Sequence, residues 1–414
     1  MRLTKLVAAA VLVGAGLVVA PAAPANAADD LTLTLARPTG PFATGTTLIH
    51  LRDASRIDPL DPQQRRREVM AQLWYPATKG ATQPLAPYAP PGETASMEAD
   101  WDAPVPDGVF AATTHSRLRA PVLPGRHKVI FVHHGICGYR TDTTVVNEQL
   151  ASLGFTVVAL ASTHESPAVE FPGGRVERTT DPAFCATGRA PWTPQNQAIL
   201  MKMLAARVGD VRFVLDQLDR VNRGENPDAS GVPLPRGLAR SMDTSRVGIF
   251  GHSFGGGTAA AVMHEDRRFV AGIDLDGLIV GPVRQAGLDR PFLVLGSSYH
   301  DIVAKPDTEL DESWVDFLPR LTGWHRWLRV NDAGHYRFID VGGSVRKWGL
   351  DFLQTQAPET WRAVFGDIDD RLSQEILVNL TSAFFARFLL GVPSPLLLCP
   401  TAFYPLVEDR TNLI

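Results

Sequence analysis

Residues 246–257 read Arg-Val-Gly-Ile-Phe-Gly-His-Ser-Phe-Gly-Gly-Gly, and this stretch decides how the fold of the chain is interpreted. Its first part, Val247 to Phe250, is β-branched and aromatic, which predicts a buried strand. The next five residues match G-x-S-x-G around Ser253, the pattern of a sharp turn that presents a serine between a strand and a helix. Glycines are needed there because a Cβ would clash with the neighbouring backbone. Small residues through Met263 then predict a helix whose N-terminus points at Ser253.

The motif also has a simpler interpretation, in which glycine and serine form only a tight turn. Strand, motif and helix occur in the order that a catalytic turn requires, so we predict that Ser253 is a nucleophile. A serine needs a base and an orienting carboxylate, and in this architecture they follow it in the order serine, acid, histidine.

We expect the base to be His335. It lies in a loop after the strand candidate at 327–330, from which an imidazole can reach back over the sheet to the serine hydroxyl. The alternative is a surface histidine without a chemical role. The other histidines after the serine are less well placed for that reach: His264, His300 and His325.

Two predicted strand ends can supply the carboxylate. Asp276 closes the strand that begins at Phe269, directly before a glycine, while Asp301 follows the next strand at 292–296. Asp274 alternates with Asp276 along one strand, and the residue nearer the strand end is the better placed. From the residues alone, Asp276 and Asp301 both remain candidates.

A glycine-containing turn, His134-Gly-Ile136, follows the predicted strand at 128–133. The end of a strand beside the serine turn is where the second donor of an oxyanion hole is expected. We therefore predict that the backbone N–H groups of Ile136 and Phe254 form this hole.

Strands and helices alternate along the chain. Such alternation predicts an α/β fold with a mostly parallel sheet covered by helices on both faces. Two strands near the N-terminus are expected to form an antiparallel pair at one edge. Two irregular stretches, 76–126 and 162–195, are expected to shape a pocket. The predicted elements include strands at 46–52, 68–75 and 155–160 and helices at 145–154, 197–220 and 372–390.

The N-terminus has the features of an export signal. Arg2 and Lys5 precede the apolar run 6–20, and an A-x-A cleavage site ends at Ala27. The run is short for a membrane span, which is the alternative. We expect a signal peptide at 1–27, an exported mature chain 28–414 forming a single catalytic domain, and no stable membrane anchor.

Composition excludes some functions and leaves others open. Hydrophobic residues make up 45% of the chain, charged residues 20%, and the net charge is −4, so nothing favours nucleic acid as a partner. No cysteine and histidine group has the spacing of a metal site, and we expect no metal or other cofactor. Three cysteines allow one disulfide, whose pairing the sequence leaves open: Cys137, Cys185 and Cys399.

Several motifs together resemble the secreted platelet-activating factor acetylhydrolase family. They are Gly251-His-Ser-Phe-Gly-Gly256, Glu265-Asp-Arg-Arg-Phe269, Gly272-Ile-Asp-Leu-Asp276, His134-Gly135 with Arg140-Thr141, and the Gly334-His335 turn. The resemblance covers the chain from Lys128 to the end of the catalytic loops, with weaker likeness in the N-terminal strands. It implies an α/β-hydrolase fold and a serine-dependent, calcium-independent lipase. It also implies nucleophile, acid, base and oxyanion donors at Ser253, Asp276, His335, Ile136 and Phe254.

The family resemblance implies a short acyl ester of a phospholipid-like molecule as substrate. The irregular stretches do not match the family, and Leu278 stands where the animal members carry tryptophan. One alternative is a cutinase-like lipase or polyester hydrolase with Asp301 as the acid. Another is a protein that binds lipid without turnover.

Overall fold

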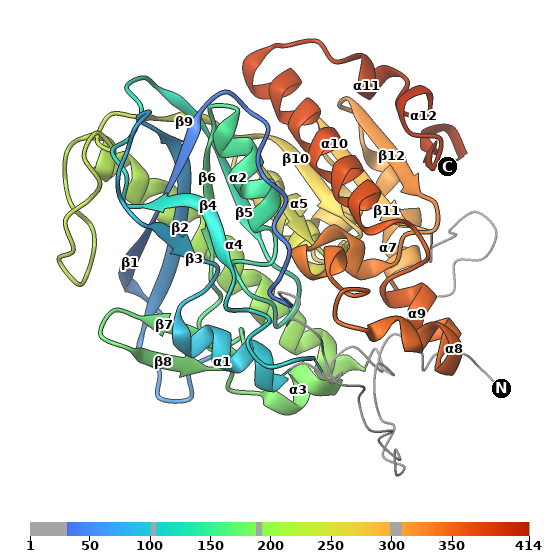
Figure 1. Cartoon of the computed structure of the whole chain (residues 1–414), viewed down its shortest axis with the longest axis horizontal. Helices are drawn as coiled ribbons and strands as arrows, with labels where there is room; N and C mark the ends of the chain where they lie inside the picture. Colours follow the sequence, from blue (N-terminus) through green and yellow to red (C-terminus); the bar gives the residue numbers. More distant parts are fainter. Residues whose placement is uncertain (1–30, 101–104, 188–192, 299–308, 414) are drawn as a thin grey trace, which may run out of the picture.

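The computed structural model describes residues 31–100, 105–187, 193–298 and 309–413 (Figure 1). Within these ranges the centre of the molecule is an 11-stranded sheet with the strand order β13-β12-β11-β10-β9-β5-β6-β2-β1-β4-β3. Its strands are β1 (Ala43–Ile57), β2 (Arg66–Ala77), β3 (Leu85–Pro87), β4 (Thr113–Leu118), β5 (His127–His133), β6 (Thr156–Leu160), β9 (Met242–His252), β10 (Phe269–Leu275), β11 (Phe292–Ser297), β12 (His325–Val330) and β13 (Val407–Asp409).

The middle of the sheet is parallel, as the sequence predicted. Strand β5 pairs in parallel with β6 and β9, and the parallel pairing continues through β10, β11 and β12. The antiparallel pair of β1 and β2 is also present. It does not form the edge, however, because β4 pairs with β1 over Gly45 and Thr46 and β3 lies outside β4. These strands are too short, or in β4 too polar, to show the apolar alternation from which a strand is predicted.

Helices cover both faces of the sheet. Their bounds are α1 (Pro91–Asp100), α2 (Thr144–Ser152), α3 (Pro182–Thr187), α4 (Pro194–Asn222), α5 (Phe254–Glu265), α6 (Val283–Ala286), α7 (Glu309–Phe317), α8 (Leu353–Gln356), α9 (Pro358–Val364), α10 (Asp370–Leu390), α11 (Pro395–Leu398) and α12 (Pro400–Phe403). None of those lying in the described ranges has the length and apolar content needed to cross a bilayer.

Alternation along the strands divides the core between the two faces. On β5, Val129 and Phe131 belong to the core cluster that contains residues of α4, α5 and α7, whereas Ile130 and Val132 belong to the cluster that contains residues of α2 and α10. Successive side chains of a strand point to opposite faces, so one apolar strand supplies both layers. The parallel strands are therefore buried on both sides, and their carboxyl ends meet at one edge of the sheet.

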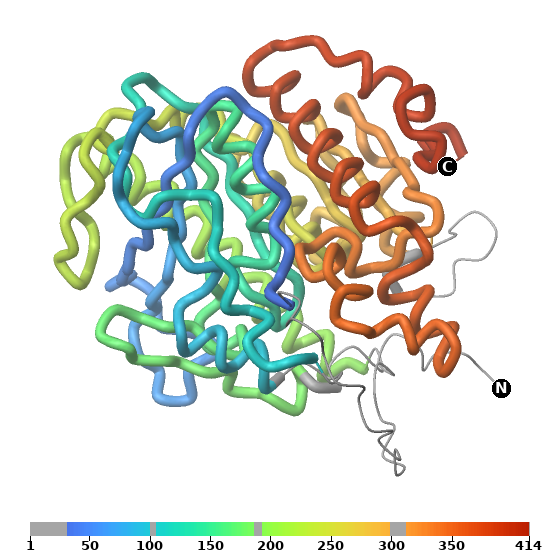
Figure 2. Tube along the Cα trace, in the orientation of Figure 1, coloured from blue at the N-terminus to red at the C-terminus, as the bar shows by residue number. Residues whose placement is uncertain are grey.

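The two stretches predicted to be irregular contain short elements. The first contributes β3, α1 and β4, and the second contributes α3 and the hairpin of β7 (Ala168–Phe171) and β8 (Arg175–Arg178). Figure 2 follows both stretches to the same end of the molecule. They contact each other there, since the Gly92 N–H donates to Oε2 of Glu170 at 2.6 Å and the Glu170 N–H donates to Oε1 of Glu93 at 2.9 Å.

A disulfide ties the second stretch to the end of β5. Cys137 is bonded to Cys185, and the exposed Cys399 is a free thiol. The sequence left this pairing open. Because Cys137 follows Ile136 directly, the crosslink anchors the turn that the sequence predicted to supply an oxyanion donor.

Candidate active site

The serine motif forms a strained turn between β9 and α5. Ser253 has φ 57° and ψ −126°, and α5 begins at the next residue, Phe254. A Cβ on Gly251 would lie 2.3 Å from the backbone carbon of Gly255, and a Cβ on Gly255 would lie 2.1 Å from the carbonyl oxygen of His133. Only glycine fits at either position, so the two glycines allow the turn that presents Ser253.

Asp276 lies beside this turn, immediately after the end of β10. The strand ends at Leu275, and Asp276 has a positive φ of 56°. Its side chain therefore does not follow the alternation of side chains along β10. The Ser253 N–H donates to the Leu275 carbonyl at 2.8 Å, which holds the two turns together. Oδ1 of Asp276 accepts from the Ser297 N–H at 2.6 Å, and the side chain is fully buried.

His335 meets the other oxygen of the same carboxylate. Its Nδ1 lies 2.6 Å from Oδ2 of Asp276, while the imidazole remains 24% exposed. The carboxylate only accepts, so Nδ1 carries the proton and Nε2 is left as the basic atom. The structure thus brings Asp276 and His335 into direct contact, whereas Asp301 lies outside the described residues.

Asp274 has a different environment from Asp276. A Cβ on Gly256 would lie 1.7 Å from Oδ1 of Asp274, so this carboxyl group packs under the first turn of α5. Burial raises its pKa well above the ordinary value, and the negative charge of Asp276 raises it further. The imidazole of His335 contacts Asp276 instead.

His252, the residue before the serine, is a neighbour of His335 that sequence analysis did not single out. Its Nε2 lies 3.0 Å from the carbonyl oxygen of His335, and the ring centroids of the two histidines are 4.4 Å apart. A carbonyl oxygen only accepts, so Nε2 of His252 is the donor. The variable position of the G-x-S-x-G motif therefore supports the backbone of the candidate base. No local pattern in the sequence indicates this contact.

Both segments predicted to supply oxyanion donors are near the serine turn. Phe254 is the first residue of α5, where a backbone N–H has no acceptor within the helix. Across the turn, a Cβ on Gly135 would lie 3.3 Å from the Cβ of Ser253, so the Gly135–Ile136 backbone borders the serine. The N–H groups of Ile136 and Phe254 therefore remain the predicted oxyanion donors.

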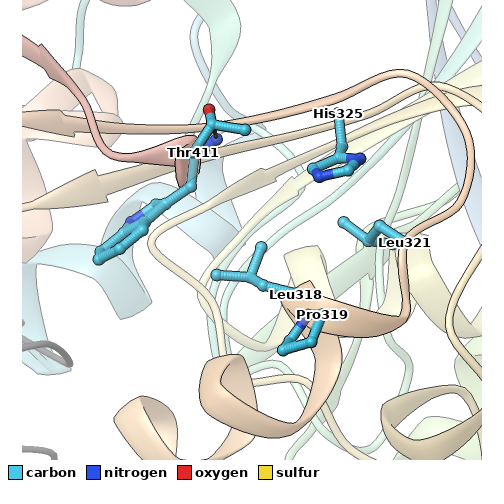
Figure 3. Close-up of a pocket in the computed structure, with 6 residues that line it drawn as sticks. Leu318, Pro319, Leu321, His325 and Thr411 are labelled. Carbon is cyan, nitrogen blue, oxygen red and sulfur yellow. Dashed lines mark hydrogen bonds between the residues drawn. The ribbon is translucent and has the colours of Figure 1, made fainter. Parts of the chain in front are cut away.

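A separate cavity of about 160 Å³ lies beside His325, the first residue of β12 (Figure 3). It is lined by Leu318, Pro319, Leu321, His325, Trp327 and Thr411. His325 begins β12 and His335 follows the end of the strand, so this cavity is remote from the serine turn. We assign it no part in catalysis.

Comparison with known proteins identifies the family. Residues 59–389 match the family model described as platelet-activating factor acetylhydrolase, isoform II. The chain belongs to this family. A probable 1-alkyl-2-acetylglycerophosphocholine esterase of Arthroderma benhamiae is 26% identical over 392 residues, which cover 90% of this chain and 92% of the relative. The platelet-activating factor acetylhydrolase of Cavia porcellus is 25% identical, with 66% of this chain and 60% of the relative covered.

A solved structure extends the likeness to another esterase. The ferulic acid esterase from Streptomyces cinnamoneus has a TM-score of 0.74 and 34% sequence identity, covering 91% of this chain and 98% of the other. The predicted family resemblance and α/β-hydrolase fold are confirmed. The chain is a serine ester hydrolase that resembles platelet-activating factor acetylhydrolase.

Proposed function

We propose that Ser253, His335 and Asp276 are a catalytic triad that hydrolyses carboxylic esters through an acyl-enzyme. The observation that carries this proposal is the hydrogen bond of 2.6 Å between His335 and the buried carboxylate of Asp276, next to a serine on a strained turn. This arrangement leaves Nε2 of His335 unprotonated and able to accept the proton of a serine hydroxyl.

In the first half of the reaction, the hydroxyl oxygen of Ser253 attacks the ester carbonyl while His335 accepts its proton. The imidazolium that forms is stabilised by Asp276, which keeps its charge. Backbone N–H groups of Ile136 and Phe254 donate to the oxygen of the tetrahedral intermediate. The intermediate then collapses, and His335 returns the proton to the leaving alcohol.

In the second half, water releases the acyl group. His335 accepts a proton from the water molecule as it attacks the acyl-enzyme, and the same backbone N–H groups hold the second oxyanion. Ser253 regains its proton from His335 when the acid leaves. Each step uses only groups of this chain and a water molecule.

We further propose a short acyl ester of a phospholipid-like molecule as the substrate class. The family match over residues 59–389 and the name of the Arthroderma relative support it. A second candidate is a feruloyl ester, because the Streptomyces esterase has a higher identity of 34% and covers 91% of the chain. The two substrates differ in the acyl group, which is an acetyl group in one and an aromatic propenoyl group in the other.

Hydrolysis of matched esters distinguishes these candidates. The mature chain is offered 1-alkyl-2-acetylglycerophosphocholine, its long-acyl analogue and methyl ferulate, with Ser253→Ala as the blank. Selective release of acetate is the expected result, and selective release of ferulate would transfer the proposal to the aromatic ester. Turnover of any of them by Ser253→Ala above the buffer rate would overturn the triad.

We also propose that the protein is exported after cleavage near Ala27 and acts as one catalytic domain, residues 28–414. The disulfide between Cys137 and Cys185 supports this, because disulfides persist in oxidising compartments. The predicted signal itself lies outside the described residues. N-terminal sequencing of protein from the culture medium tests the proposal, with a start at Ala28 as the expected result and retention in the cytoplasm as the contrary one.

A further inference from the structure

Arg207, on the long helix α4, contacts the backbone of the turn at residues 134–136, which is expected to supply one oxyanion donor. Its side chain is fully buried. One terminal nitrogen, Nη1, donates to the carbonyl of His134 at 2.8 Å, and the other, Nη2, donates to the carbonyl of Gly135 at 2.8 Å. One guanidinium therefore holds two successive peptide groups of the turn.

The carbonyl oxygen of Gly135 is a point where several donors converge. Besides Arg207, it accepts from Nδ1 of His134 at 2.6 Å and from the Gly138 N–H at 3.2 Å. Burial lowers the pKa of His134 well below the ordinary value, and the charge of Arg207 lowers it further, so the ring is neutral. Its one proton is on Nδ1, because a carbonyl oxygen only accepts.

This convergence sets the direction of the Ile136 N–H. The carbonyl of Gly135 and the N–H of Ile136 belong to one planar, trans peptide group, in which they point in opposite directions. With the oxygen held by Arg207, the N–H of Ile136 points away from the guanidinium. Gly135 itself borders Ser253, because a Cβ on it would lie 3.3 Å from the Cβ of Ser253. Donors on the oxygen also polarise the peptide group, which strengthens its N–H as a donor.

The same guanidinium contacts the second candidate donor residue. The Cζ atom of Arg207 lies 4.7 Å from the ring centroid of Phe254, within the range of a cation–π contact. The side chain of Phe254 is thus held by the cation that also orients the Ile136 peptide. Arg207 links the two halves of the candidate oxyanion hole.

Glu165 balances the charge of Arg207 and extends the arrangement. Its Oε2 accepts from Nε of Arg207 at 2.9 Å, Oε1 accepts from Nη2, and its side chain is fully buried. Oε1 also accepts from the Cys137 N–H at 3.4 Å. Only a planar fork of five donors can serve one carboxylate and two carbonyls together, and lysine cannot reproduce this geometry.

We propose that Arg207, neutralised by Glu165, is a positioning residue that orients the Ile136 peptide and holds the side chain of Phe254 for stabilisation of the oxyanion. This inference rests on the proposed triad. A buried ion pair is by itself weak evidence for stability, so a purely structural role is the alternative. The distinction is whether loss of the guanidinium fork affects the transition state more than substrate binding.

Two variants keep the buried charges balanced, because removing one partner of such a pair is strongly destabilising. Arg207→Lys retains the charge without the fork, and Arg207→Met combined with Glu165→Met removes both charges. The matched control is Arg212→Met, on the same helix, whose side chain is 48% exposed. Thermal melting of all three shows which are folded.

We expect kcat to fall about 10- to 100-fold in both charge-balanced variants, with KM changed much less. Affinity for a trifluoromethyl ketone, whose adduct with the serine carries an oxyanion, falls by the same factor as kcat/KM. Arg212→Met leaves both quantities unchanged. A common loss of turnover and of oxyanion affinity is not expected from a purely structural residue.

The inference is overturned if a folded variant keeps the parental kcat and the parental ketone affinity. It is also rejected if neither variant folds, since Arg207 is then a structural residue. An error in the proposed triad would be recognised separately. In that case Ser253→Ala, in which Arg207 is unchanged, would retain activity.

Discussion

The Nδ1 atom of His335 lies 2.6 Å from Oδ2 of Asp276, although 59 residues separate the two in sequence. The remaining oxygen of the carboxylate accepts from the Ser297 N–H, so both oxygens have a partner in a buried site. A carboxylate held in this way fixes both the tautomer and the orientation of the imidazole. The relationship favours Asp276 as the acid of the proposed triad.

Asp276→Asn is expected to lower kcat about 10⁴-fold while the protein remains folded, because the amide favours the wrong tautomer of His335. The measurement is turnover of a soluble aryl ester, with thermal melting as the test of folding. Asp301→Asn is the matched comparison and is expected to retain parental turnover. The opposite pair of results would assign the acid to Asp301.

His252→Ala is expected to lower kcat about 10- to 100-fold. The substitution removes the hydrogen bond from Nε2 of His252 to the carbonyl oxygen of His335, and it removes the imidazole ring that lies 4.4 Å from the ring of His335. KM for the same aryl ester should change little. His264, exposed on α5, provides the control, and His264→Ala should behave like the parent. Equal activity of both alanine variants would show that His252 does not support the base.

Replacing both Cys137 and Cys185 by serine is expected to lower the free energy of unfolding by about 4 kcal/mol. The crosslink closes a loop with a sequence separation of 48, and its loss restores conformational freedom to the unfolded chain. Urea denaturation measures the difference. Cys399→Ser, which removes only the free exposed thiol, should leave the midpoint unchanged; a comparable shift in that variant would contradict the assignment.

The ionisation of Asp58 is expected to make the stability of the fold depend on pH. Burial alone would raise its pKa, but hydrogen bonding from His164 and the charge of Arg67 outweigh this effect and lower the pKa to about 2. A lowered pKa means that the carboxylate stabilises the fold above the unfolded value of 3.8, and that this contribution is lost as the pH falls toward 2.

Asp58→Asn should therefore be less stable than the parent at pH 7, and the difference should narrow between pH 4 and pH 2. At pH 7 the loss is expected to be about 3–5 kcal/mol, because the fully buried Arg67 loses one of its two carboxylate partners. Thermal melting of both proteins across this pH range is the measurement. A difference independent of pH would contradict the role of the charged carboxylate.

Much of the fold followed from local patterns. Apolar runs predicted the parallel strands, and small residues after the G-x-S-x-G motif predicted α5, because periodicity and glycine placement act over a few residues. The short strands β3 and β4 were not predicted, since pairings of only two residue pairs leave no alternation in the sequence. Which strands form this edge of the sheet was therefore decided by tertiary pairing.

The sequence by itself determined the class of the protein, the serine turn and the strand ends from which an acid and a base could come. These features are encoded by neighbouring residues, whose backbone preferences do not depend on distant parts of the chain. Only the tertiary structure decided which carboxylate among the described residues meets His335, which cysteines pair, and that Arg207 and His252 contact the site. Such contacts join residues far apart in sequence, and they arise from the packing of α4 and the loops on the sheet, which no local pattern records.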